Sequence, residues 1–309
     1  MPLSIRARAM QEKYLSPRAL KFGSDKTSWS YRRIQACEGS LAHSLDLEWN
    51  GFPSLFQRET CSDQVSLEWL EVVGQYSGCK MTLWKDKWPA FQGLANEVAK
   101  AQDWRVVHGL GHHRLGADLL WRTLNLEPGT LELGEPSRSW LNAKGRTVLP
   151  YTWQADVIDA SIFLQAPSVL MDTKASTGDI PNSVIQIEAC MTELETVLPV
   201  KLSGNCTLTV KYPTFPSDKP DRLLPGWWFP DSTSTPNGDL WALHIMSCHG
   251  SCRDAKSCYC STGLVVVAVK DRSGYWRRIG FCNTSELYLY NKDGLPCPWN
   301  RKKTTIYLV

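Results

Sequence analysis

The stretch TGLVVVAVKDRSGYWRRIGFC, residues 262–282, decides the fold of the second half of the chain. Its first part is a run of β-branched apolar residues, and its second part, from Tyr275, is again rich in residues that favour strands. Arg272-Ser273-Gly274 lies between the two parts and supplies the residue types of a tight turn. The stretch therefore predicts a β-hairpin.

Further runs with the character of strands lie on both sides of this hairpin. They are VIDASIFLQA (157–166), NCTLTVKY (205–212), DLWALHIMSC (239–248) and TTIYLV (304–309). Turn formers such as PNGD and NKDG separate or follow them. Several short strands at this spacing predict an antiparallel sandwich or barrel.

The first half of the chain has helical periodicity instead. In SLEWLEVVGQYS (66–77) and PAFQGLANEVAKAQ (89–102), apolar residues recur three and four positions apart, and Pro89 suits a first helical turn. GADLLWRTLN (116–125) predicts a third short helix with three inward leucines, Leu119, Leu120 and Leu124. In the first helix the stripe is formed by Leu67, Leu70, Val72 and Val73.

These patterns predict an α+β protein with two domains. Prolines and glycines cluster between residues 126 and 150, which places the boundary there. We expect a mainly helical domain over residues 1–125, packed on an antiparallel β sandwich or barrel over residues 126–309.

Composition restricts the classes of partner. The 309 residues include 34 Lys and Arg against 31 Asp and Glu, with no concentrated basic cluster, so we expect no nucleic-acid partner. No run of apolar residues is long enough for a membrane span. The N-terminal residues lack the apolar core of a secretion signal, so the 11 cysteines are interpreted as mainly reduced thiols of a cytoplasmic protein.

The segment RARAMQEKYLSPRALKFGSDKTSW, residues 6–29, resembles the final motif of the fungal heterokaryon-incompatibility (HET) domain. The matching positions are Arg6, Gln11, Glu12, Leu15, Ser16, Pro17, Arg18, Leu20, Phe22 and Gly23, whereas Arg8 replaces a tryptophan of the family. Downstream segments, including Trp69, Tyr76, Asp118-Leu119-Leu120-Trp121 and EPSRSWLNAKG (135–145), resemble the region that follows the domain. The resemblance therefore covers most of the chain in order.

The resemblance implies a TIR-like domain with NAD-cleaving or death-signalling activity, but the chain lacks the Tyr-rich first strand and the central motifs of that domain. A doubly wound domain without half of its sheet has no nucleotide site at its strand ends. We therefore do not expect the family's NADase activity in this chain.

The densest group of metal-capable residues is CHGSCRDAKSCYC, residues 248–260. Cys248 and Cys252 have a spacing that zinc sites use, whereas Cys258 and Cys260 are only one residue apart. We interpret them as thiols of a loop between two strands, with a structural metal as the open alternative. The chain has no Gly-x-Ser-x-Gly elbow, dinucleotide fingerprint or Walker motif, so we expect no cofactor.

Aromatic residues are concentrated in the β half. LLPGWWFPD (223–231) places Trp227 and Trp228 in what its prolines and glycine indicate is a loop. Such residues suit either core packing or the wall of an apolar pocket. For a pocket, the candidate substrate-binding residues are Trp153, Trp227, Trp228 and Trp241, and the candidate catalytic residues are His244, Tyr212 and Arg277.

Two functions follow from these observations. The first is a cofactor-independent enzyme of fungal secondary metabolism that cyclises an apolar terpenoid or polyketide intermediate, for example in a Diels–Alder type step, by positioning and hydrogen bonding. The alternative is a truncated HET-family interaction protein that acts in self/non-self recognition or cell death. The enzyme requires a closed apolar cavity, whereas the interaction protein requires an exposed apolar patch.

Overall fold

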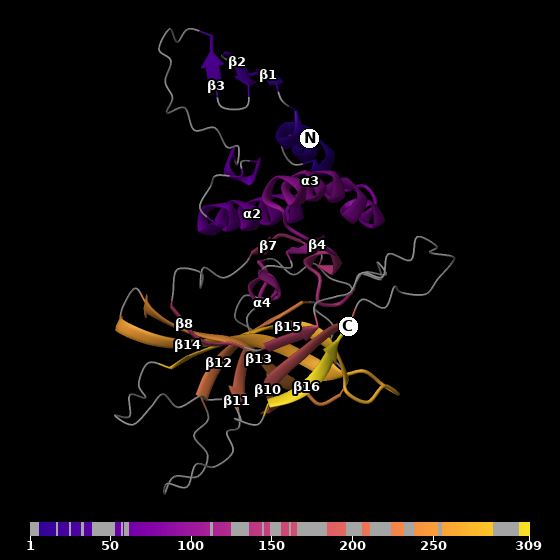
Figure 1. Ribbon diagram of the computed structural model, residues 1–309, viewed down its shortest axis with the longest axis vertical. Coiled ribbons are helices and arrows are strands. Elements are labelled where there is room, and N and C mark those ends of the chain that lie inside the picture. The colour runs from indigo at the N-terminus through magenta and orange to yellow at the C-terminus, as the bar shows by residue number, and fades with distance from the viewer. Residues whose placement is uncertain are drawn as a thin grey trace, which may run out of the picture. The chain divides into compact units, whose positions relative to one another are not determined.

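The computed structural model describes residues 6–16, 18–24, 26–31, 34–38, 53–56, 58, 62–111, 114–124, 136–143, 145–148, 156–160, 162–165, 184–195, 206–210, 224–231, 238–252, 255–286 and 303–309. The chain divides into two compact units, residues 1–109 and 110–309. The first contains the long helices and the second contains a large sheet, so the protein is of the α+β class (Figure 1). The packing of a helical domain on the β domain stays a prediction.

The helices of the first unit are α1 (Ala7–Leu15), α2 (Ser62–Ser77) and α3 (Lys87–Gln102), with short 3-10 helices η2 (Pro53–Phe56) and η3 (Trp84–Asp86). The structure confirms the two long helices predicted from periodicity. The α3 helix ends at Asp103 in a left-handed conformation, and a short strand, β4 (Val106–Val107), follows.

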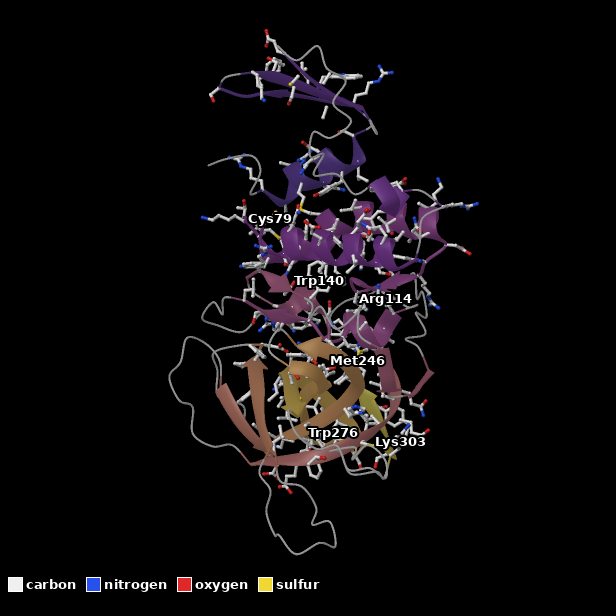
Figure 2. The ribbon with its side chains drawn as sticks, turned by 90° about the vertical axis from the view of Figure 1, so that its left-hand side faces the viewer. Cys79, Arg114, Trp140, Met246, Trp276 and Lys303 are labelled. Carbon is white, nitrogen blue, oxygen red and sulfur yellow. The ribbon has the colours of Figure 1, made fainter. Side chains whose placement is uncertain are left out.

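The core of this unit lies along α2 and α3. The buried apolar residues of α2 are Val65, Trp69, Val72, Val73 and Tyr76, and those of α3 are Phe91, Leu94, Ala95 and Val98. Leu67 and Leu70 are only half-buried, so the buried stripe of α2 lies slightly to one side of the predicted one. Cys79, labelled in Figure 2, follows α2 and is buried. Its sulfur lies 3.8 Å from that of Met10 in α1.

A small antiparallel sheet precedes α2. It consists of β1 (Arg18–Phe22), β2 (Thr27–Tyr31) and β3 (Ile34–Cys37), in that order. Leu20 pairs with Trp29, and Trp29 pairs with Ala36, so these three residues form one row across the sheet. The periodicity of the first half did not predict β2 and β3.

The second unit begins with short elements: β5 (Leu110–Gly111), α4 (Leu115–Asp118), β6 (Arg122–Thr123), η5 (Trp140–Asn142) and β7 (Thr147–Val148). The prediction of a helix over 116–125 is wrong beyond Asp118, because β6 pairs with β7. Leu119 and Leu120 are buried as expected, but Leu124 is exposed. The carbonyl groups of Leu119 and Trp121 accept hydrogen bonds from Arg278 instead of continuing a helix.

The described residues of this unit form a nine-stranded sheet. Its strands are β8 (Asp156–Ala160), β9 (Ile162–Gln165), β10 (Ile185–Glu195), β11 (Cys206–Val210), β12 (Leu224–Pro230), β13 (Trp241–Cys252), β14 (Ala255–Ala268), β15 (Tyr275–Glu286) and β16 (Lys303–Leu308). The β15–β16 pair is parallel, and the other described pairs are antiparallel. The predicted hairpin is confirmed as β14–β15, with Gly274 at a φ of 78° in its turn.

The strand pairings run in a closed circuit. The β10 strand pairs with β13, and the circuit continues through β14, β15, β12 and β11 back to β10. One contact cluster contains buried residues from five of these strands, which identifies the inner face of the circuit. Its members are Cys190, Leu194, Trp228, Leu240, Ala242, Val265, Val267 and Cys282.

The opposite face of the same strands is also covered. Residues 242–245 of β13 and 262–267 of β14 are buried without interruption. Because neighbouring residues of a strand project to opposite faces, an uninterrupted buried run means that both faces of the strand are packed. Buried residues on this opposite face of the circuit include Leu243, Leu264, Val266 and Phe281.

Candidate functional site

Four residues form a continuous row on the inner face of the circuit. His244 of β13 pairs with Gly263 of β14, Gly263 pairs with Cys282 of β15, and Cys282 pairs with Trp228 of β12. Directly paired residues project to the same face of a sheet. We call His244, Gly263, Cys282 and Trp228 the inner row. Two of its members, His244 and Trp228, are residues that the sequence singled out.

Glycines make room for the aromatic member of this row. A side chain at residue 280 would meet Nε1 of Trp228, so the indole occupies the space above Gly280. A side chain at residue 263 would meet the carbonyl oxygen of Leu243. The sheet backbone therefore approaches its neighbours more closely here than any larger residue would allow.

The inner row is buried but not fully paired. Trp228 is 8% exposed, and its Nε1 donor has no hydrogen-bond acceptor among the described residues. The Thr192 hydroxyl of β10, on the same face as Cys190 and Leu194, also has no partner in the described part of the chain. A buried donor without an acceptor costs about 1–3 kcal/mol, so such an atom is a place where a water or ligand oxygen binds favourably.

The thiol in the row is chemically quiet. Burial raises the pKa of Cys282 to about 12, against smaller lowering effects from Arg278 and from the Gly263 backbone. The sulfur therefore remains a protonated thiol near neutral pH, whereas a cysteine nucleophile requires the thiolate. The chemistry that the row offers is hydrogen bonding to one acceptor oxygen in apolar surroundings.

The other sequence-predicted residues lie elsewhere. Trp241 is on the opposite face of β13 from its neighbour Ala242, and it contacts Trp276 with 5.9 Å between ring centroids. Trp276 is labelled in Figure 2. Arg277 of β15 is exposed. Trp227 lies in β12, but its side chain is outside the described residues, as are Tyr212 and Trp153 altogether. The structure thus places His244 and Trp228 in one row on the same face of the sheet, on β13 and β12 with β14 and β15 between them, and leaves Trp241 and Arg277 outside this row.

Two segments interpreted as loops are strands. Residues 248–252 continue β13, residues 255–260 begin β14, and Cys248 pairs with Cys260. The side chains of these cysteines lie outside the description, so the metal alternative stays a prediction. LLPGWWFPD is also not a loop, because residues 224–230 form β12 between β11 and β15.

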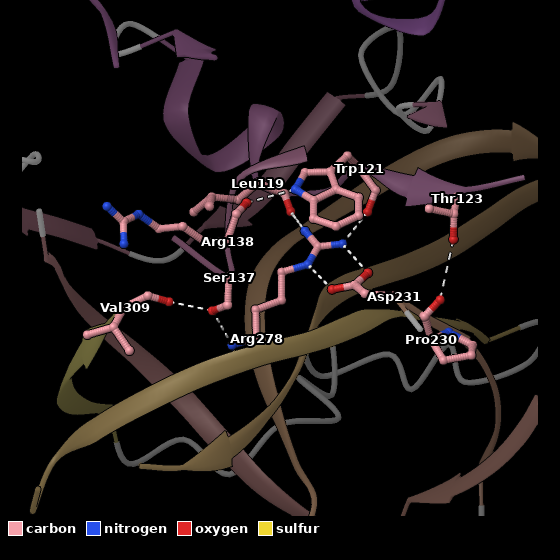
Figure 3. Close-up of polar contacts among 9 residues, drawn as sticks. All are labelled: Leu119, Trp121, Thr123, Ser137, Arg138, Pro230, Asp231, Arg278 and Val309. Carbon is pink, nitrogen blue, oxygen red and sulfur yellow. Dashed lines mark hydrogen bonds and ion pairs between the residues drawn. The ribbon is translucent and has the colours of Figure 1, made fainter. Parts of the chain in front are cut away.

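A second polar centre, which the sequence did not indicate, surrounds Arg278. Nε and Nη2 of its guanidinium group donate to the two carboxylate oxygens of Asp231 at 2.9 and 3.0 Å (Figure 3). Nη1 donates to the carbonyl of Leu119 and Nη2 to that of Trp121, and the guanidinium lies 3.5 Å from the Trp121 ring centroid. Burial raises the pKa of Asp231, and the charge and hydrogen bonds of Arg278 oppose that rise.

This centre connects segments that are distant in sequence. The Arg278 backbone N–H donates to the Ser137 hydroxyl, which itself donates to the carbonyl of Val309 (Figure 3). Nη1 of Arg138 donates to the carbonyl of Leu308 at 3.3 Å. Because each nitrogen of the Arg278 guanidinium group already donates to a protein acceptor, the arrangement is typical of a structural link and leaves little for a ligand to bind.

The first unit carries an exposed apolar surface. Leu20 and Phe22 of β1 and Trp29 of β2 are 55%, 79% and 39% exposed, although all three are large apolar residues. Register and alternation place them on one face with Thr27 and Ala36, and we call this the outer face. A shallow hollow of about 400 Å³ borders this face, lined by its Thr27, Trp29 and Ala36 together with Cys37 and Glu38.

No family model, no curated protein and no solved structure matches this chain. No helix in the described residues is long and apolar enough to span a membrane. Two features of the described residues therefore bear on function: the buried inner row and the exposed outer face.

Proposed function

We propose that this chain is an interaction protein that binds a protein partner through the outer face. The observation that carries this proposal is the exposure of Leu20, Phe22 and Trp29 on one side of a three-stranded sheet. In the described residues, five large apolar side chains are exposed, and three of the five are these. A contiguous apolar patch of this kind is typical of an interaction site.

Burial of this face by a partner is energetically favourable. Burying one large apolar side chain contributes about 1.5–3 kcal/mol, and Phe22 keeps most of its surface in water. A small sheet also gains independent stability only when a hydrophobic face is packed. A partner that covers Leu20, Phe22 and Trp29 would supply both gains. The resemblance of residues 6–29 to the last HET motif supports an origin in that signalling family, and we propose an interaction role without NADase activity.

The experiment tests whether the outer face contacts a partner in the cell. A photo-cross-linking phenylalanine analogue replaces Phe22 in one variant and Ser28, on the opposite face of the same sheet, in the control. We expect a discrete adduct from position 22 and none from position 28. The adduct protein is then purified, and Trp29→Ser should weaken its rebinding to the chain at least tenfold. Absence of an adduct from position 22, or unchanged rebinding by Trp29→Ser, would overturn the proposal.

A second measurement separates a docking face from a face that the chain itself covers. Because Phe22 is 79% exposed, Phe22→Ser should change the free energy of unfolding by less than about 0.5 kcal/mol. Phe91→Ser in the core of α3 is the matched variant, and it should cost about 3–5 kcal/mol. A large destabilisation by Phe22→Ser would mean that the face is part of the core.

The inner row favours a second candidate function, the cofactor-independent cyclisation of an apolar terpenoid or polyketide intermediate. Its support is the buried Trp228 N–H without an acceptor, in one row with the buried His244. A carbonyl oxygen of a substrate would accept that hydrogen bond, and such a bond strengthens as charge grows on the oxygen. The closed circuit of paired strands supports the barrel form of the predicted fold, with the row on its inner side.

This second candidate has its own test. The purified chain is incubated with linear polyene ketones and aldehydes, and the products are identified by mass spectrometry. Trp228→Phe keeps an aromatic side chain and removes the N–H, so it should lower turnover about 100-fold if this donor stabilises the transition state. Trp241→Phe, on the other face of β13, is the matched control. Equal turnover of the chain and of Trp228→Phe would exclude the row as a catalytic site.

A further inference from the structure

We infer that the partner of the outer face is a second copy of this chain. The inference rests on the function proposed above and adds the identity of the partner. The outer face carries opposite charges at its two ends. Arg18 is exposed at the start of β1, in the row that it forms with Tyr31 and Ile34, and Glu38 is exposed directly after β3.

The register places these two residues at diagonal corners of the sheet. Glu38 lies beside Thr27, since its backbone N–H donates to the Thr27 carbonyl at 2.8 Å and its carboxylate accepts from the Thr27 N–H at 3.4 Å. Thr27 pairs with Phe22, at the end of β1 opposite to Arg18. The Leu20–Trp29–Ala36 row lies between the two charged ends.

A two-fold contact uses this arrangement twice. In a symmetric dimer the same patch is present on both subunits. We place the two-fold axis midway between the two sheets, parallel to them and perpendicular to the line from Arg18 to Glu38. Rotation about this axis exchanges the two corners, so Arg18 of each copy faces Glu38 of the other. The strands of the two sheets then cross steeply, as in orthogonal sheet packing, and the apolar row of one copy packs on that of the other. A second copy thus offers both an apolar surface and a complementary charge pattern to the outer face.

The size of the face determines how strong such a dimer is. Three strands about 4.8 Å apart and five residues long cover roughly 14 by 17 Å, so the contact buries roughly 500–800 Å² in total. This is below the roughly 1,200 Å² of a standard stable interface. We therefore expect a reversible dimer in exchange with the monomer.

Sedimentation velocity over a range from low to high micromolar concentration tests the inference. The full chain should shift from monomer toward dimer as its concentration rises. Trp29→Ser should weaken the dimer at least tenfold, whereas Lys100→Glu, an exposed charge change on α3 and outside the small sheet, should leave it unchanged. Circular dichroism checks that each variant is folded.

Charge reversal identifies the pairing itself. Arg18→Glu alone and Glu38→Arg alone should each weaken the dimer about 3- to 10-fold, because like charges then face each other. The double variant Arg18→Glu/Glu38→Arg restores opposite charges across the two-fold axis and should recover most of the affinity. A loss in the double variant as large as the sum of both single losses would overturn the pairing.

The two proposals fail in different ways. A chain that stays monomeric at every concentration, but still forms the position 22 adduct with another protein, would overturn the second-copy inference and keep the interaction function. A chain that yields neither a dimer nor an adduct would overturn both. A dimer that is weakened by Trp29→Ser and restored by the charge swap would support both.

Discussion

Lys87 offers a quantitative test of the packing in the first unit. It is the first residue of α3, its side chain is 1% exposed, and its ammonium lies 5.6 Å from the centroid of the Trp84 ring. Burial lowers the pKa of Lys87 from 10.5 to about 7. A lysine in this position therefore makes the stability of the fold depend on pH between about pH 7 and pH 10.5.

The direction follows from proton binding in the two states. Between pH 7 and pH 10.5 the unfolded chain keeps the Lys87 proton, whereas the folded chain has released it, so stability rises with pH across this window. Each pH unit contributes about 1.4 kcal/mol at most, so the gain from pH 7 to pH 9 is about 2–3 kcal/mol. Below pH 7 both states are protonated, and the folded state retains the full cost of the buried charge.

Urea unfolding at pH 7, 8 and 9, followed by far-ultraviolet circular dichroism, measures this gain. Lys87→Met keeps the length of the side chain and removes the charge. Between pH 7 and pH 9 its stability should therefore rise by about 2–3 kcal/mol less than that of the unchanged chain, and at pH 7 it should be about 2–4 kcal/mol more stable. Lys85→Met, at an exposed position two residues earlier, is the matched control and should keep the slope. Equal slopes for the unchanged chain and for Lys87→Met would refute the assignment.

Three further predictions concern the second unit. Arg278→Met leaves the Asp231 carboxylate without its partner and should lower the free energy of unfolding by about 3–5 kcal/mol. Arg277→Met, on the exposed side of the same strand, should change it by less than about 0.5 kcal/mol. Similar losses for the two variants in urea unfolding would contradict the network around Arg278. Gly280→Ala places a methyl group against the indole ring of the inner row and should cost about 1–3 kcal/mol; an unchanged melting temperature would show that the ring lies elsewhere. Cys282 should resist iodoacetamide in the folded chain and Cys37 should react, as site-resolved mass spectrometry can show; early labelling of Cys282 would contradict its burial.

The elements that the sequence predicted well are those whose pattern is local. The hairpin of β14 and β15 follows from two apolar runs and a glycine turn, and α2 and α3 follow from an apolar stripe, so neither depends on distant residues. The β10 strand was missed because IQIEACMTELE contains good helix formers. Its strand character is visible only in the alternation of the buried Ile185, Ile187 and Ala189 with the less buried Gln186 and Glu188.

Other errors arise from features that a single sequence does not contain. Pro225, Gly226 and Pro230 indicate a loop, but β12 pairs on both sides. The sequence analysis named Arg277 as a candidate catalytic residue, but it did not predict the register shift between Val265 and Val266. Because of this shift, Val265 pairs with Gly280 and Val266 pairs with Arg278. The extra residue, Ile279, helps to determine which of the two arginines is buried. Such a bulge depends on the packing of the whole sheet.

The enzyme requires a closed apolar cavity, whereas the interaction protein requires an exposed apolar patch, and this difference decides between the two candidate functions. Around the inner row, apolar side chains from five strands are already buried, so a ligand there gains from one unpaired donor and must displace packed groups. At the outer face, Leu20, Phe22 and Trp29 remain in water, so their burial energy is available to whatever covers them. Binding is driven by what folding leaves unsatisfied, and in the described residues the larger unsatisfied term lies on the outer face. For this reason the interaction function is the stronger of the two proposals.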